Sequence, residues 1–108
     1  MPYISKGYFN AVDEALQQGY DIIERFEEST EDSSLLEVID GDFTAWRTSF
    51  LSYLKKHFSM QCGEYIDVFE RTDDCNISNV KLYINVLRQI RNGILEEIIF
   101  PDSYLKEK

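Results

Sequence analysis

Residues 5–28 read SKGYFNAVDEALQQGYDIIERFEE, and this stretch decides the fold class. Its apolar residues recur at alternating steps of four and three, the spacing of one face of an α-helix. That face comprises Tyr8, Val12, Ala15, Gly19, Ile22 and Phe26. Further apolar residues beside the face widen it, so we expect a helix that packs against more than one neighbour in a bundle.

The middle of the chain predicts two more helices. Ser, Thr and acidic residues are common in residues 29–41, which we expect to be an acidic connection, part of which packs down as a turn of helix. Asp42 is placed to cap a helix over 42–58. Its apolar positions are Phe43, Trp46, Phe50 and Leu54. A shorter helix over 62–71 then precedes a run of turn-forming residues.

The last strong pattern predicts a long helix over 77–100. A cap at Asn76 or Ser78 should begin this helix, and Pro101 should end it, because proline cannot donate a backbone hydrogen bond. Gly93 lies inside this span and marks either close packing or a tolerated weakness. Residues 101–108 are expected to form a short polar tail.

These segments together predict an all-α fold. We expect residues 1–108 to form one domain, a compact bundle of about four helices in which the first and last long helices pack together. Apolar residues make up 44% of the chain and aromatic residues 14%, which is enough for one hydrophobic core. No apolar run is long enough to span a bilayer and no signal peptide is recognisable, so the cytoplasm is the expected location.

Charge is concentrated in one part of the chain. The net charge is −9, and residues 21–42 hold nine acids against one base, Arg25, whereas the rest of the chain is nearly neutral. Because nucleic-acid binding depends on clustered Lys and Arg, we expect no direct nucleic-acid ligand.

The sequence contains no recognisable catalytic or metal-binding pattern. His57 is the only histidine, and the two cysteines, Cys62 and Cys75, are expected to be reduced thiols. We therefore predict a protein that is not an enzyme and has no catalytic residue, metal or cofactor. A hydrolase that binds Mg²⁺ through scattered carboxylates is a less favoured alternative.

Arg91-Asn92 raises the question of a nuclease. These two residues resemble the start of the Arg-x4–6-His motif found in helical ribonucleases of toxin systems. No histidine follows in residues 93–98, so the general acid or base of such a nuclease would be missing. We expect no ribonuclease activity.

The acidic segment allows two interpretations. It is either a solvated flank that favours solubility or a binding surface for a basic partner, with the carboxylates imitating the phosphates of nucleic acid. The residues proposed for the second interpretation are Glu24, Glu27, Glu28, Glu31 and Asp32.

From Phe43 onward, aromatic and aliphatic residues follow one another in a recognisable order. They are Phe43, Trp46, Phe50, Leu54, Phe58, Tyr65, Phe69, Leu87, Ile90 and the run 93–95. In this order, residues 43–95 resemble a helical domain of bacterial defence proteins that precedes TIR-like or other nucleotide-responsive effector domains. Ser59 departs from this pattern, where glycine is common, and we expect no effector domain after Pro101. The resemblance implies a regulatory or oligomerising module that acts through protein partners.

The favoured function is therefore a protein-interaction module that binds a protein partner or itself, with a role in bacterial defence. The alternative is a small acidic inhibitor, of the kind that phages encode, which occupies the basic groove of a nuclease or regulator. Neither function involves a membrane or a direct contact with nucleic acid.

Overall fold

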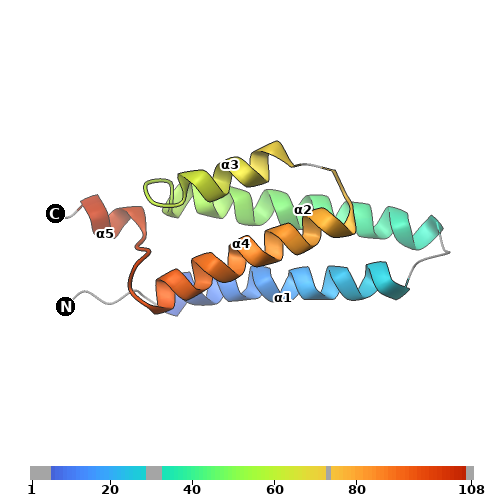
Figure 1. Cartoon of the computed structure of the whole chain (residues 1–108), viewed down its shortest axis with the longest axis horizontal. Coiled ribbons are helices and arrows are strands. Elements are labelled where there is room, and N and C mark those ends of the chain that lie inside the picture. The colour runs from blue at the N-terminus through green and yellow to red at the C-terminus, as the bar shows by residue number, and fades with distance from the viewer. Residues whose placement is uncertain (1–5, 29–32, 73, 107–108) are drawn as a thin grey trace.

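The computed structural model describes residues 6–28, 33–72 and 74–106. Throughout these residues the regular secondary structure is helical, which confirms the all-α prediction. The helices are α1 (Lys6–Glu28), α2 (Ser33–His57), α3 (Gly63–Arg71), α4 (Ile77–Leu95) and α5 (Asp102–Lys106). They form an elongated bundle of 53 × 23 × 17 Å (Figure 1).

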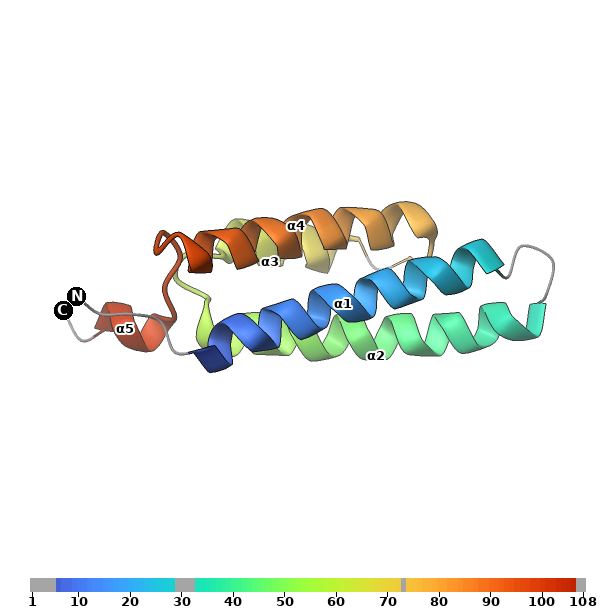
Figure 2. The same ribbon diagram turned by 90° about the horizontal axis from the view of Figure 1, so that it is seen from below.

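Two pairs of helices make up the bundle. The long helices α1 and α2 lie side by side as an antiparallel hairpin, α4 packs along α1, and α3 packs along α2 (Figures 1 and 2). The contact between α1 and α4 confirms that the first and last long helices pack together. The C-terminal end of α1 and the N-terminal end of α2 extend beyond α3 and α4 (Figure 1).

The start of α2 differs from the prediction. Residues 29–41 were expected to connect two helices, but α2 begins at Ser33, so Asp42 lies inside the helix and does not cap it. The physical reason is Ile39, which is 1% exposed and lies four residues before the buried Phe43 on the same helical stripe. Burial of this stripe outweighs the weak helix propensity of the polar residues around it.

The end of α4 also differs from the prediction. The helix expected over 77–100 ends at Leu95, five residues early. Glu97 has a φ of 60°, the left-handed conformation that often terminates a helix. The Ile98 amide then donates to the Gly93 carbonyl at 2.8 Å, as in a Schellman motif. The start of α4 agrees with one of the two expected caps, because the side chain of Asn76 accepts a bond from the Asn79 amide.

Gly93 is explained by the chain reversal that follows it. A Cβ atom at Gly93 would lie 2.5 Å from Cδ1 of Ile99, which folds back over the helix at this point. Close packing is therefore the role of Gly93. Residues 101–108 are not simply a polar tail, since they contain α5 and since Asp102 is only 6% exposed.

Asp102 joins the C-terminal segment to the loop between α2 and α3. Its carboxylate accepts hydrogen bonds from the Ser59 amide at 3.0 Å, the Ser59 hydroxyl at 2.6 Å and the Met60 amide at 2.9 Å. In addition, Gln61 accepts a 2.6 Å bond from the Phe100 amide. A buried carboxylate needs such donors, because burial without them would be costly.

Trp46 is the side chain on which α1, α2 and α4 meet. Its indole N–H donates to the Ala15 carbonyl of α1 at 2.8 Å. Its ring lies against Gly19, where a Cβ atom would approach both Trp46 Cζ2 and Ile84 Cγ1 to 2.8 Å. Gly19 therefore allows α1 to lie close to the indole and to α4.

Tyr83 of α4 lies at the centre of an aromatic cluster and is fully buried. Its ring stacks on Phe43 with centroids 5.6 Å apart and meets Phe69 edge-on at 5.0 Å. Its hydroxyl forms a 3.1 Å hydrogen bond with the hydroxyl of Thr72, at the end of α3. The cluster thus joins α2, α3 and α4 while satisfying the one polar atom of Tyr83.

Two glycines in helices should respond oppositely to alanine. At Gly41 no atom lies within 4 Å of an added Cβ, so Gly41→Ala should raise the free energy of unfolding by about 0.5–1 kcal/mol. At Gly19 an added Cβ would overpack the core at a cost of roughly 1–3 kcal/mol, which outweighs the gain in helix propensity. Gly19→Ala should therefore lower the free energy of unfolding by about 1 kcal/mol. Urea denaturation of both variants measures the difference, and equal shifts would contradict the packing described for Gly19.

Asp102→Asn should also destabilise the fold. The amide keeps the shape of the side chain but replaces one acceptor oxygen with a donor that faces other donors. We expect a loss of about 1.5–3 kcal/mol, the usual contribution of a hydrogen bond to a charged group. Glu96→Gln, at an exposed position, serves as the control in urea denaturation. A midpoint unchanged from that of the native chain would show that the Asp102 bonds contribute little.

Candidate functional site

The exposed acids at the C-terminal end of α1 are the part of the predicted surface that the structure describes. Glu24, Glu27 and Glu28, called here the α1 acidic end, all lie exposed on the last turns of the helix. None of the four ion pairs found among the described residues includes them. The other two predicted residues, Glu31 and Asp32, lie outside the described residues.

This arrangement of charge does not favour the helix itself. The C-terminal end of a helix carries a partial negative charge, so carboxylates are unfavourable there. Arg25 is the only basic residue in the last turn of α1, and Glu24 and Glu28 form a like-charge pair four residues apart. Stability therefore gives no reason for acids at these positions.

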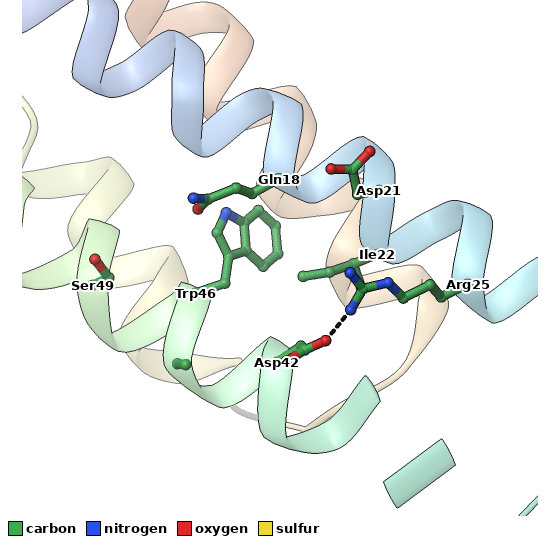
Figure 3. A pocket seen from close by; sticks show the side chains of 8 residues that line it. Gln18, Asp21, Ile22, Arg25, Asp42, Trp46 and Ser49 are labelled. Carbon is green, nitrogen blue, oxygen red and sulfur yellow. Dashed lines mark hydrogen bonds and ion pairs between the residues drawn. The ribbon is translucent and has the colours of Figure 1, made fainter. Parts of the chain in front are cut away.

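Arg25 turns toward α2 and away from the α1 acidic end. It forms an ion pair with Asp42, the residue that was expected to cap a helix (Figure 3). Beside this pair an open hollow of about 410 Å³ lies between α1 and α2 (Figure 3). Its lining consists of Gln18, Asp21, Ile22, Arg25, Asp42, Ala45, Trp46 and Ser49.

A second hollow of about 190 Å³ continues along the same two helices. It shares Gln18 and Ser49 with the first, so the two form one groove, called here the α1–α2 groove. The second hollow is lined by Ala11, Val12, Glu14, Ala15, Gln18, Ser49, Phe50, Tyr53, Leu54 and Leu87. Local sequence patterns do not predict this groove, since a groove depends on how two helices face each other.

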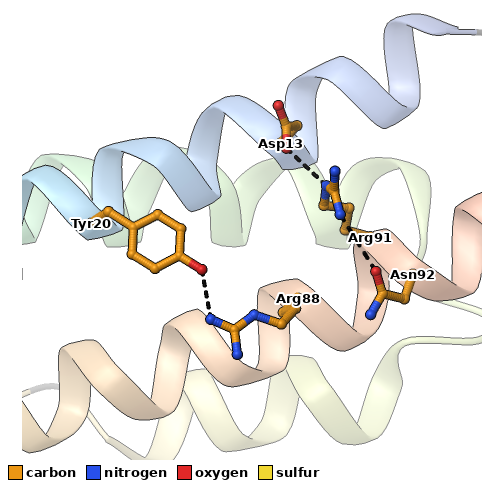
Figure 4. Close-up of polar contacts among 5 residues, drawn as sticks. All are labelled: Asp13, Tyr20, Arg88, Arg91 and Asn92. Carbon is orange, nitrogen blue, oxygen red and sulfur yellow. Dashed lines mark hydrogen bonds and ion pairs between the residues drawn. The ribbon is translucent and has the colours of Figure 1, made fainter.

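The arginines of α4 hold α4 against α1. Arg91 forms a 2.8 Å ion pair with Asp13 (Figure 4). Arg91 also lies over the ring of Phe9, with 5.0 Å between the guanidinium carbon and the ring centroid. Arg88 donates to the Tyr20 hydroxyl at 2.6 Å (Figure 4). The contacts of Arg91 therefore account for this residue through packing, without a role in a nuclease motif.

His57 lies at the end of α2 and packs between aromatic rings. Its ring centroid is 5.5 Å from that of Tyr8 and 4.6 Å from that of Tyr53. Such contacts indicate a half-buried structural residue. Across the described residues, no group of three or more His, Cys, Asp and Glu side chains could hold a metal ion. The absence of a metal, a cofactor and an enzymatic activity stays a prediction.

Both cysteines are free thiols, and both are protected from ionisation. Burial, together with the nearby Asp102 carboxylate, raises the pKa of Cys62 to about 12. Burial, together with the charge of Asp40 and a hydrogen bond to it, raises the pKa of Cys75 to about 11. Because the thiolate is the nucleophile, neither residue is suited to catalysis at neutral pH.

Comparisons with protein-family models, with curated proteins and with solved structures found no match for this chain. The resemblance of residues 43–95 to helical domains of bacterial defence proteins therefore stays a prediction. Within the described residues no helix is long and apolar enough to cross a membrane.

The thiols provide a test of the site chemistry. At about pH 8 both should react slowly with Ellman's reagent in the folded protein, and Cys62, which is fully buried, should react more slowly than Cys75. Their raised pKa values favour the protonated form in the folded state, so this contribution to stability is present below about pH 9 and is lost as the pH rises through each folded pKa. Rapid labelling of either thiol at about pH 8 would show that it is more accessible than described.

Proposed function

We propose that this chain is a non-enzymatic protein-interaction module that binds a basic partner protein through the α1 acidic end. The observation that carries the proposal is a set of exposed carboxylates, free of ion pairs with the described residues, on the projecting end of α1. Complementary charge of this kind speeds association and selects among partners.

The cost of these charges to the helix supports the same conclusion. Natural sequences place residues that weaken a local structure mainly where function requires them. Glu24, Glu27 and Glu28 oppose the helix dipole, whereas a solvated flank would reach the same solubility with acids placed elsewhere. The resemblance of residues 43–95 favours a role in bacterial defence or its regulation.

A second candidate is an inhibitor that imitates nucleic acid. Glu24 and Glu28 lie four residues apart on one edge of α1, about 6 Å along the helix axis, with Glu27 on the adjoining turn, so the three acids form a short acidic cluster. Such a cluster would suit the basic groove of a nuclease or a regulator. The two candidates differ in the partner and share the surface.

Reversing the α1 acidic end tests both candidates. The triple variant Glu24→Lys, Glu27→Lys, Glu28→Lys should no longer capture the partner from native cells, whereas the native chain should retain it at low salt and release it at high salt. Because lysine suits the end of a helix, the variant should be at least as stable as the native chain, so lost capture cannot be attributed to unfolding.

A matched control changes the same charge elsewhere. Glu64, Asp74 and Glu96 are exposed acids outside the α1 acidic end, and their reversal to lysine should leave capture intact. Mass spectrometry of the captured protein separates the candidates: a nucleic-acid enzyme indicates the inhibitor, and any other basic protein indicates the interaction module. Unchanged capture by the Glu24/Glu27/Glu28 variant would contradict the proposed surface.

A further inference from the structure

The α1–α2 groove exists because its walls carry small side chains. Ala45 of α2 lines the first hollow, Ala11 and Ala15 of α1 line the second, and Ser49 of α2 lines both, so short side chains occur along the whole groove and leave space between the helices unfilled. Apart from Leu87 of α4, every residue that lines the groove belongs to α1 or α2. No side chain of α3 or α5 contributes to it, within the described part of the chain.

The groove has the length of a docked helix. Its lining on α1 runs from Ala11 to Arg25, which is roughly 21 Å at 1.5 Å per residue. An occupying helix of about 14 residues would span that length. Helices pack at interaxial distances of about 8–10 Å, and small residues along a seam permit the closest approach.

The groove has an apolar floor and an acidic α1 wall. Ile22 and Phe50 are buried members of the core and lie at its floor. Glu14 and Asp21 are exposed carboxylates on its α1 wall, and the one basic residue of the lining, Arg25, is paired with Asp42. The groove therefore offers an apolar strip with unneutralised negative charge beside it.

We infer that the α1–α2 groove binds an amphipathic helix of the partner, with an apolar face directed at Ile22 and Phe50 and with Lys or Arg side chains that pair with Glu14 and Asp21. This inference rests on the proposed function and names the kind of segment that the basic partner contributes. Helix-in-groove binding is a common form of peptide recognition, and the acidic edges fix the charge of the occupant.

A second copy of the chain does not fit the groove as well as a basic helix does. The apolar faces of α1 and α4 are used in the bundle itself, where Val12, Leu16, Val80 and Leu87 are buried. The exposed large apolar side chains on the described helices are Tyr20, Leu82 and Leu95, and they are too scattered to form an apolar stripe that could insert into another molecule. With a net charge of −9, two copies would also repel each other.

The probe is a synthetic amphipathic peptide of about 16 residues, with leucines at steps of three and four and lysines on both flanks. A second peptide carries glutamate in place of every lysine. Trp46 is the only tryptophan and lines the groove, so its fluorescence reports binding directly. Backbone amide shifts in NMR spectra then show where the peptide lies.

Two single substitutions separate the groove from general attraction to an acidic protein. Ser49→Arg adds bulk and positive charge where the two hollows meet, and it should weaken binding of the lysine peptide about tenfold or more. Thr48→Arg makes the same charge change at an exposed neighbour that does not line the groove, and it should weaken binding by about twofold or less. Both sites are exposed, so both variants should fold.

We expect the lysine peptide to bind and the glutamate peptide not to bind. Binding should shift NMR signals along both walls of the groove, and of the two variants only Ser49→Arg should lose affinity for the peptide. Equal binding of the two variants, shifts confined to the α1 acidic end, or self-association in place of peptide binding would each overturn the inference. A different result would contradict the proposed function: the cellular partner would still be captured after reversal of Glu24, Glu27 and Glu28.

Discussion

The insertion of Trp46 against Gly19 is the interaction on which the rest of this bundle depends. The indole fills the junction of α1, α2 and α4, and its N–H finds an acceptor in the Ala15 carbonyl, so a large side chain is buried without leaving a polar atom unpaired. Gly19 makes this possible because any side chain there would overlap the indole and Ile84. The aromatic cluster around Tyr83 extends from this junction and attaches α3.

The same junction determines which surfaces stay open. Because α4 packs along α1 and α3 packs along α2, the seam between α1 and α2 has small side chains on its walls and no further described helix over it. The hairpin also extends beyond α3 and α4, which carries the end of α1 away from the body of the bundle (Figure 1). The acidic end thus lies on α1, the helix that also forms one wall of the groove.

Three polar residues show how far local patterns can be trusted. Asp42 has the chemistry of a helix cap, yet it lies inside α2 and pairs with Arg25, because burial of Ile39 extends the helix past it. Ser59 departs from the resemblance, and Asp102 belongs to an expected tail, yet they bind each other across 43 residues. A carboxylate, a hydroxyl and two backbone amides satisfy one another here only because the fold brings them together.

The sequence alone predicted the helical class, the approximate spans of α1, α3 and most of α2, a cap at Asn76 or Ser78 before α4, and the acidic character of the end of α1. These properties depend on spacing and composition along one segment, and local periodicity reports them. The early start of α2, the end of α4 at Leu95, the burial of Asp102 and the α1–α2 groove were decided only by the tertiary structure. The end of α4 depends on the left-handed conformation of Glu97, which helical periodicity does not report. The other three follow from contacts between segments far apart in the chain, which no local pattern encodes.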